Sequence, residues 1–318
     1  MNRRLILDVD TGTDDAIAIM MAGLSPDLDL IACTTVWGNH DVDTTTENTL
    51  RVLDHIDHSD VPVYRGLGKP YAPIPFLFPD YADSDRTIVH PHDFPIASRT
   101  SDVRATPAVE WLVETLRAAT ERVTLVPVAP LTNIAAAITL DPRIVDAVDE
   151  VVLMGGAHAL GNVTPAAEAN IWHDPVAADV VFQAGFERLV LVPLDATHEA
   201  IVSLDQTRAL RATGTPAAVA AAAIIEQRIT GYNEILPTGA ADTAPVHDAL
   251  CIAYLLDPAV LDVAPYRVQI DTVSPLSFGK TIVDVDNRAR SAANCHVALG
   301  ADATLFNDLM FRTLSEGR

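Results

Sequence analysis

The sequence begins with a cluster of acidic residues that could hold a cation. Four aspartates, Asp8, Asp10, Asp14 and Asp15, follow a short apolar run and lie within eight residues of one another. One or two of them could cap the next helix, because acidic side chains are favoured at a helix N-terminus. Capping does not account for four, since like charges this close repel unless a cation or a shared proton compensates them. Oxygen ligands favour Ca²⁺ or Mg²⁺ over zinc, so the cluster predicts a site for a hard divalent cation.

The same aspartates permit a second interpretation. An Asp-Val-Asp sequence at the end of a first strand is also typical of phosphatases that use an aspartyl nucleophile. That chemistry requires a phosphate-binding Ser or Thr after a second strand and a downstream lysine near further acidic residues. The chain has two lysines, Lys69 and Lys280, and neither lies in that context. The cation site is therefore the better supported of the two interpretations.

Two further strand ends carry groups that suit a sugar or a cation. The second predicted strand ends in Thr34–Asn39, and an asparagine amide can both donate to and accept from a sugar hydroxyl. Taken alone, Gly38-Asn39 is an ordinary turn. The third strand runs into a proline turn after Val128, and the backbone carbonyl of such a residue is a suitable calcium ligand. The functional interpretation of both motifs requires that they lie beside the aspartates at one edge of a sheet.

A loop of small residues after Met154 contains Asn162, Glu168 and Asn170. Glu168 and Asn170 are two positions apart, so they could point toward one ligand. Asn and Glu in loops are also commonly solvated, so this spacing leaves both interpretations open.

The pair His247-Asp248 begins a predicted helix that ends near Leu256. A His-Asp pair at a helix start is often no more than a cap. Its functional interpretation therefore depends on the other motifs.

The elements that must position these residues alternate between strands and helices. Apolar runs rich in Val, Ile and Leu predict buried parallel strands at Leu5–Val9, Leu28–Val36, Val123–Val128, Glu150–Met154 and Arg188–Leu194. Helical patterns lie between them at Asp15–Leu24, Thr106–Thr120, Leu131–Thr139 and Pro175–Gly185. This order predicts an α/β fold with a mostly parallel, Rossmann-like open sheet flanked by helices. Ligands bind such sheets at the carboxyl ends of the strands, where the motifs lie.

The rest of the chain continues as one unit. Ser203–Asp257 is mainly helical, and strands return at Tyr266–Ile270, Thr281–Val285 and Cys295–Leu299 before a final helix from Asp302. No linker, repeat or low-complexity tract divides the chain, so we expect a single domain over residues 1–318. The Pro- and Asp-rich residues 70–101 have the composition of a long loop, and we expect a mobile active-site loop there.

Composition excludes several classes of protein. With 49% hydrophobic residues among 318, the chain can bury a large core. A net charge of −22 without a basic cluster argues against nucleic-acid binding and against anionic membranes. The three cysteines are widely spaced and predict no disulfide framework, and no apolar stretch is long enough for a membrane span. We therefore expect a cytoplasmic protein.

Together the motifs resemble the inosine–uridine nucleoside hydrolase family, in the family's order and from residue 5 to about residue 310. The opening resembles the signature DxDxGxDDAxA, and Thr34–Asn39 is similar to the family's TTVxGN. The further matches are Leu131–Ala135 (LTNIA), the Met154–Gly156 turn, the Gly161–Asn170 loop (GNxTPxAExN) and the His247-Asp248 pair. The resemblance implies Ca²⁺-dependent hydrolysis of the N-glycosidic bond of ribonucleosides, giving ribose and a free purine or pyrimidine base.

The resemblance also implies roles for individual residues. The cation would be held by Asp10, Asp15, Asp248 and the backbone carbonyl of Val128, and Asp10 would deprotonate the attacking water that the cation activates. His247 would donate a proton to the leaving base. The ribose would be bound by Asp14, Asn39, Met154, Asn162, Glu168 and Asn170. An acidic site of this kind favours the oxocarbenium-like transition state of glycoside cleavage.

Departures from the family pattern concern the base more than the sugar. The family's AEFN is Ala167-Glu168-Ala169-Asn170 here, so an aromatic ring is missing beside the sugar. The segment often written HGxxGL is replaced by His90–Pro95 without its glycines. His90 and His92 could contact a base or lie in solvent, and Tyr232 and Asn233 could line the base pocket or pack at a helix end. The preferred base stays open.

Two alternatives to an ordinary nucleoside hydrolase remain at this point. One is a nucleoside- or ribose-binding protein without turnover, although retention of Asp10 and His247 favours an enzyme. The other is a hydrolase of a modified nucleoside. We also expect a homodimer or homotetramer, between which the sequence does not choose.

Overall fold

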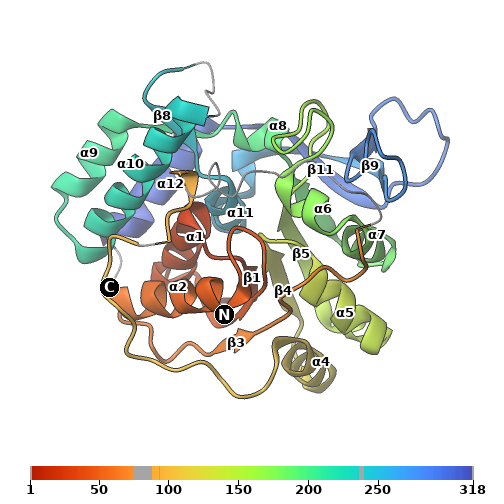
Figure 1. Cartoon of the computed structure of the whole chain (residues 1–318), viewed down its shortest axis with the longest axis horizontal. Coiled ribbons are helices and arrows are strands. Elements are labelled where there is room, and N and C mark those ends of the chain that lie inside the picture. Colours follow the sequence, from red (N-terminus) through yellow and green to blue (C-terminus); the bar gives the residue numbers. More distant parts are fainter. Residues whose placement is uncertain (1, 75–87, 93, 236–239, 317–318) are drawn as a thin grey trace.

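A nine-stranded sheet runs through the computed structural model, which describes residues 2–74, 88–92, 94–235 and 240–316 (Figure 1). The strand order is β10-β9-β11-β6-β5-β4-β1-β2-β3, and only β9 runs antiparallel to its neighbours. The strands are β1 (Arg3–Val9), β2 (Leu28–Thr35), β3 (Val63–Arg65), β4 (Val123–Pro127), β5 (Val148–Met154), β6 (Leu189–Val192), β9 (Leu261–Ile270), β10 (Thr281–Asp284) and β11 (Cys295–Ala301). A separate two-stranded sheet pairs β7 (Ile201–Ser203) with β8 (Thr243–Pro245).

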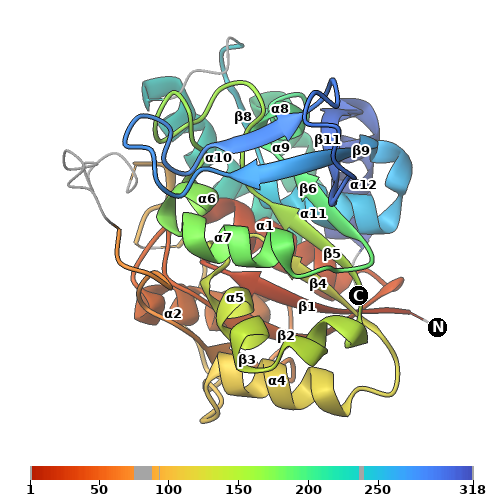
Figure 2. The ribbon, with the colours of Figure 1, turned by 90° about the vertical axis from the view of Figure 1, so that its right-hand side faces the viewer.

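Helices cover both faces of the large sheet (Figure 2). One face carries α1 (Thr13–Leu24), α2 (Val42–His55), α9 (Leu204–Ala212), α10 (Pro216–Ile235), α11 (His247–Leu256) and α12 (Ala303–Glu316). The other face carries α4 (Ala108–Ala118), α5 (Thr132–Leu140) and α7 (Pro175–Gln183). Shorter helices are α6 (Ala169–His173), α8 (Leu194–Thr197), η1 (Pro142–Ala147) and η2 (Pro258–Val260).

Strand β1 shows how the apolar sequence builds two cores. Leu5 and Leu7 pack in the cluster under α1, whereas Ile6 belongs to the cluster under α4 and α5. Successive side chains of a strand point to opposite faces, so a strand buried on both faces is apolar throughout. Helix α1 is buried on nearly all sides, which explains why it too lacks a polar stripe.

The strand order reverses beside β1, which pairs in parallel with both β2 and β4. From β1 the chain proceeds outward to β2 and β3, and later strands continue from β4 in the other direction. Such a switch point leaves a crevice beyond the carboxyl ends of the two central strands. Asp10 follows β1 and Val128 follows β4, so the topology brings these two motifs together.

The predicted α/β architecture and mostly parallel sheet are confirmed. The boundaries of the predicted strands and helices shift by a few residues, except that β9 begins five residues before the predicted Tyr266. The sequence did not predict α2, because its buried face is partly polar: Thr45, Thr46 and Thr49 are buried beside its apolar residues. Thr49 pairs with Thr11 at 2.7 Å, and Thr46 pairs with Thr35 at 2.7 Å. A threonine-rich face hides the apolar period on which the prediction rested.

Much of the predicted mobile loop over residues 70–101 lies outside the described residues, namely 75–87 and 93. Of its described part, His90 reaches the start of α1, where the Thr13 N–H donates to His90 Nδ1 at 3.2 Å. Arg51 of α2 donates to the carbonyls of Phe94 and Ile96 and so fixes the end of the segment. Among the described residues, none of the helices combines the length and the hydropathy that a membrane span requires.

Candidate functional site

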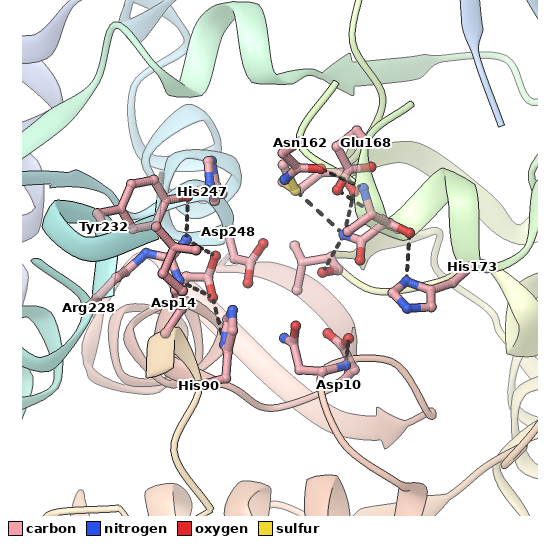
Figure 3. A pocket seen from close by; sticks show the side chains of 17 residues that line it. Asp10, Asp14, His90, Asn162, Glu168, His173, Arg228, Tyr232, His247 and Asp248 are labelled. Carbon is pink, nitrogen blue, oxygen red and sulfur yellow. Dashed lines mark hydrogen bonds and ion pairs between the residues drawn. The ribbon is translucent and has the colours of Figure 1, made fainter. Parts of the chain in front are cut away.

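A cavity of about 200 Å³ opens at the carboxyl edge of the sheet, beside the switch point. Figure 3 shows Asp14, Arg228, Tyr232 and His247 on one side of it and Asn162, Glu168 and His173 on the opposite side. Its lining comprises Asp10, Asp14, Asn39, Val89, His90, Val128, Met154, Asn162, Glu168, Ala169, Asn170, His173, Arg228, Tyr232, Ile235, His247 and Asp248. The five sequence motifs therefore meet at one place.

Three buried aspartates, Asp10, Asp14 and Asp248, line this cavity, and a fourth, Asp15, lies beside them without lining it. Asp10, Asp14, Asp15 and Asp248 are each at most 5% exposed. Asp14, Asp15 and Asp248 offer carboxylate oxygens that all lie within 4.8 Å of one another. The helix starts of α1 and α11 bring them together, since Asp14 and Asp15 open α1 and Asp248 opens α11.

Local backbone geometry fixes two of these carboxylates. Asp15 accepts the N–H of Asp10 at 3.1 Å and that of Gly12 at 2.9 Å, so it does cap α1. Asp10 Oδ2 accepts the N–H of Asn39 at 2.6 Å. A Cβ atom at Gly38 would lie 2.0 Å from Asp10 Oδ2, so the turn after β2 needs glycine to approach the aspartate.

Burial raises the pKa of every carboxyl in the cluster, and neighbouring carboxylates raise the pKa values of Asp10, Asp15 and Asp248 further. The pKa of Asp15 rises to about 7, through burial and then through the charge of Asp14. The pKa values of Asp10 and Asp248 rise well above the ordinary value for the same two kinds of reason. Asp10 Oδ1 is also buried without a hydrogen-bond partner in the described part of the chain. A cluster of oxygens that is costly to ionise, with one oxygen unpartnered, fits a hard divalent cation.

The opposite wall is built from the loop after β5. Glu168 caps α6 and accepts the N–H groups of Gly156 at 2.7 Å, Asn170 at 2.9 Å and Ile171 at 3.2 Å. Burial raises the pKa of Glu168 to about 7, although these bonds favour its ionised form. Its carboxylate is therefore rigidly placed in the cavity wall.

Asn170 and Asn162 complete this wall. The Asn170 amide donates to the carbonyls of Val128 at 3.0 Å and Met154 at 3.2 Å. The Asn162 side-chain oxygen accepts the N–H of Ala169 at 2.9 Å. Amide groups held in this way can present fixed donors and acceptors to a polyhydroxylated ligand.

The remaining wall is a chain of side-chain contacts between α10, α11 and α8. The Tyr232 hydroxyl lies 2.7 Å from His247 Nε2, and His247 Nδ1 lies 2.7 Å from Thr197 Oγ1. Arg228 pairs with Asp14 through both carboxylate oxygens. Burial and the charge of Arg228 lower the pKa of His247 well below its ordinary value. Burial raises the pKa of Tyr232 to about 12, so its hydroxyl keeps its proton near neutral pH.

The structure places the residues left open by the sequence as follows. His90 lines the cavity, but His92 does not and instead packs on the ring of His40 with centroids 4.6 Å apart. Tyr232 lines the cavity, whereas Asn233 bonds to Asp242 away from it.

The phosphatase interpretation fails on the position of Asp8, which would have to attack a phosphate. Asp8 is 1% exposed and does not line the cavity.

Two polar residues of the cavity were not predicted from the sequence, Arg228 and His173. Arg228 lies in an alanine-rich helix four residues before Tyr232, so the two share a helix face. That spacing was the one signal that could have found it. His173 follows the Glu168–Asn170 motif, with its Nδ1 2.6 Å from the Ala169 carbonyl.

Comparisons with known proteins agree with this geometry. Residues 5–308 match the family model described as inosine-uridine preferring nucleoside hydrolase. The chain is 36% identical to the pyrimidine-specific ribonucleoside hydrolase RihA of Shewanella sp. strain ANA-3, over 99% of this chain and 97% of that protein. It is 38% identical to the pyrimidine-specific ribonucleoside hydrolase RihB of Escherichia coli O157:H7, over 96% of this chain and 94% of that protein. The solved structure of a purine-preferring ribonucleoside hydrolase from Gardnerella vaginalis superposes with a TM-score of 0.89 at 30% identity, covering 99% of this chain and 98% of that one.

Proposed function

Because the chain belongs to the inosine–uridine preferring nucleoside hydrolase family, whose members cleave the N-glycosidic bond of ribonucleosides, we propose that the cavity described above is the active site and that it holds Ca²⁺. The observation that carries the proposal is the meeting of four buried aspartates with a wall of fixed Asn and Glu side chains. One wall suits a cation, and the other suits the hydroxyls of a ribose.

Asp10, Asp15, Asp248 and the Val128 carbonyl are the proposed cation ligands. All are oxygen donors, which suits Ca²⁺. A divalent cation in such a site lowers the pKa of a water and orients sugar hydroxyls. Asp10 Oδ1, which is unpartnered in the described part of the chain, is the proposed acceptor of the attacking water's proton.

The sugar is the proposed ligand of the opposite wall and of the turn after β2. Asn39, Asn162, Glu168 and Asn170 can hydrogen-bond hydroxyls, and Asp14 and Met154 line the same cavity. Their negative charge and their acceptor oxygens favour the positive charge that develops on the sugar as the bond breaks. A site that bonds a hydroxyl this closely should reject the deoxy analogue by roughly 10⁴-fold.

We propose that the leaving base lies against Tyr232 and His247. The Thr197 hydroxyl lies 3.4 Å from the Leu194 carbonyl and donates to it, so it accepts the Nδ1–H of neutral His247. The Nε2 atom of His247 then accepts the Tyr232 hydroxyl proton. The two side chains form one hydrogen-bonded unit, and we propose that this unit protonates the departing base. The proton is the one shared between the Tyr232 hydroxyl and His247 Nε2, and the negative charge left on the Tyr232 oxygen faces the Arg228 guanidinium.

Pyrimidine ribonucleosides are the proposed substrate class. The relatives RihA and RihB, which share 36% and 38% identity with the chain, are described as pyrimidine-specific. The purine-preferring structure is less similar in sequence, at 30% identity.

The experiment is a measurement of reducing-sugar release from uridine, cytidine, inosine, adenosine and 2′-deoxyuridine, before and after calcium removal. We expect fastest release from uridine or cytidine, loss of release with a calcium chelator, and recovery when calcium is added back. Release that survives the chelator would contradict the calcium proposal. Binding of uridine without sugar release would favour a binding protein. Sugar release only from modified nucleosides would replace pyrimidine ribonucleosides as the proposed substrate class.

Two further expectations stay predictions. A homodimer or homotetramer is checked by light scattering after size-exclusion chromatography, and a monomer would contradict it. A cytoplasmic location is checked by fractionation of the producing cells.

A further inference from the structure

Arg228 lies in the wall of the cavity and is almost completely buried, at 1% exposure. Its Nε donates to the Pro245 carbonyl at 2.5 Å, and its Nη1 donates to Thr13 Oγ1 at 2.9 Å and to Asp14 Oδ1 at 3.0 Å. Its Nη2 lies 2.9 Å from Asp14 Oδ2 and donates to the Tyr232 hydroxyl at 3.4 Å. Because a guanidinium has five N–H groups, these contacts use all of its donors.

This saturation decides what Arg228 can do. A guanidinium with every donor committed cannot bond a substrate without losing a partner. Its effect on the reaction must therefore pass through the groups that it holds, chiefly Asp14 and Tyr232. Burying its charge is also costly unless a carboxylate compensates it, and the pair with Asp14 supplies that compensation.

Asp14 is the residue of the cluster whose role is ambiguous. Its carboxylate has an oxygen within 4.8 Å of those of Asp15 and Asp248, so by distance alone it is as good a cation ligand as they are. It differs from them in its partner. Within residues 2–74, 88–92, 94–235 and 240–316, an arginine pairs with Asp14, and none pairs with Asp10, Asp15 or Asp248.

We propose that Arg228 is a positioning residue that holds Asp14 out of the cation's ligand set and reserves it for a ribose hydroxyl. The bidentate contact occupies both oxygens of Asp14 on the side facing α10, and it cancels one of the four negative charges around the cation. The same guanidinium orients Tyr232, so it joins the sugar end of the cavity to the base end. The inference rests on the proposed function, because it assigns Asp14 to the ribose.

The test is the calcium affinity of the Arg228→Gln variant, measured by chelator competition in the absence of substrate. Removing a positive charge near a divalent ion, and freeing Asp14 to turn toward it, should tighten calcium binding by about tenfold. In the same variant, the preference for uridine over 2′-deoxyuridine or 3′-deoxyuridine should fall at least about tenfold, because Asp14 no longer faces the sugar in a fixed orientation.

Three further variants separate positioning from simple support of the fold. Arg228→Lys keeps the charge without the two-armed contact, so calcium affinity should stay near wild type while the hydroxyl preference falls. The double variant Arg228→Gln with Asp14→Asn removes both charges and should return calcium affinity to near wild type. Arg211→Gln breaks the pair between Arg211 of α9 and Glu226 of α10, which lies outside the cavity, and should change neither quantity.

The outcomes are distinct from those of the proposed function. Sugar release by the wild-type enzyme tests the proposed function, whereas calcium affinity is read without turnover. Calcium affinity that is weaker or unchanged in Arg228→Gln, or a hydroxyl preference that survives in both single Arg228 variants, would overturn the inference. If Arg228→Gln does not fold, the Arg228→Lys variant decides it through the same two measurements.

Discussion

The two ends of the cavity hold their polar groups by different means. At the cation and sugar end, backbone groups fix the carboxylates: Asn39 N–H binds Asp10, Gly12 N–H binds Asp15, and three N–H groups bind Glu168. At the base end, side chains hold one another in a series that runs from Asp14 through Arg228, Tyr232 and His247 to Thr197.

This difference bears on what each end can change. Groups fixed by the backbone at strand ends and helix starts depend on the fold and on short sequence motifs. Groups fixed by other side chains depend on α1, α8, α10 and α11 together, and one substitution alters the whole series. We infer that the first end sets the reaction and the second end sets which base leaves.

The largest expected effect comes from breaking the backbone-fixed end at Asp10. Asp10→Asn should lower kcat for uridine by about 10³-fold or more, because it removes both the proposed proton acceptor and a proposed cation ligand. The measurement is ribose release at saturating calcium. Asp8→Asn is the matched control, since Asp8 lies two residues earlier on the chain and outside the cavity, and it should retain wild-type turnover. Near-normal activity of Asp10→Asn would remove Asp10 from the mechanism.

A second test of the same end uses pH. Burial raises the pKa of Glu168 to about 7, so the carboxyl is protonated on the acidic side and ionised on the basic side. Only the ionised form can accept hydrogen bonds from ribose hydroxyls with both of its oxygens. The contribution of Glu168 to kcat/KM should therefore appear as the pH rises through about 7. We expect Glu168→Gln to lose about 10²-fold in kcat/KM at pH 8 and less at pH 5.5.

The informative quantity in that experiment is the ratio of wild-type to variant kcat/KM, because titration of other groups cancels in it. Glu150→Gln serves as the control, since Glu150 is also a buried glutamate and lies outside the cavity. A ratio that does not change between pH 5.5 and 8 would show that the charge of Glu168 is not used.

The two ends also differ in how far the sequence could predict them. Asp10, Asn39 and Val128 follow strands β1, β2 and β4, and the ends of parallel strands meet at one edge, so pattern and topology suffice to bring them together. Arg228 could not be predicted in this way. A single arginine in an alanine-rich helix is typical of a solvent-facing position, and only the packing of α10 against α1 shows that it is buried.

The fold shows the same division. The central strands and α1 were predicted because a continuous apolar run is typical of an element that is buried on all sides. Helix α2 was missed because threonines interrupt the apolar residues of its buried face, and two of them pair with Thr11 and Thr35 outside the helix. Polar burial is satisfied by tertiary contacts, which a local pattern does not contain.

The role of the base end in protonating the leaving group is tested by Tyr232→Phe, which removes one hydroxyl and keeps the ring. Loss of the contact with His247 should lower kcat for uridine by about tenfold and leave 4-nitrophenyl riboside within about threefold of wild type, because that leaving group needs no proton. Tyr254→Phe is the control: its buried hydroxyl bonds to Arg188 outside the cavity. Equal losses on both substrates would mean that Tyr232 acts only through packing.

The smallest effect on turnover, and a clear one on stability, is expected at Asp8, which is buried and does not line the cavity. Its Oδ1 accepts from Thr34 at 2.6 Å and from Asn133 at 2.8 Å, whereas Oδ2 is buried without a partner in the described part of the chain. Burial raises its pKa from 3.8 to about 7, so the folded state binds a proton that the unfolded state has lost in that range, and stability falls as the pH rises through it.

Asp8→Asn keeps the accepting oxygen and cannot ionise, so its advantage should grow between pH 4 and 7 and reach about 2–4 kcal/mol at pH 8. Urea unfolding of the calcium-depleted protein at pH 5 and pH 8 measures it. An advantage that is the same at both pH values would show that the fold does not raise the pKa of Asp8. Stabilisation at Asp8 together with loss of turnover at Asp10 would show that two aspartates of one short motif have separate tasks, one in the core and one in the cavity.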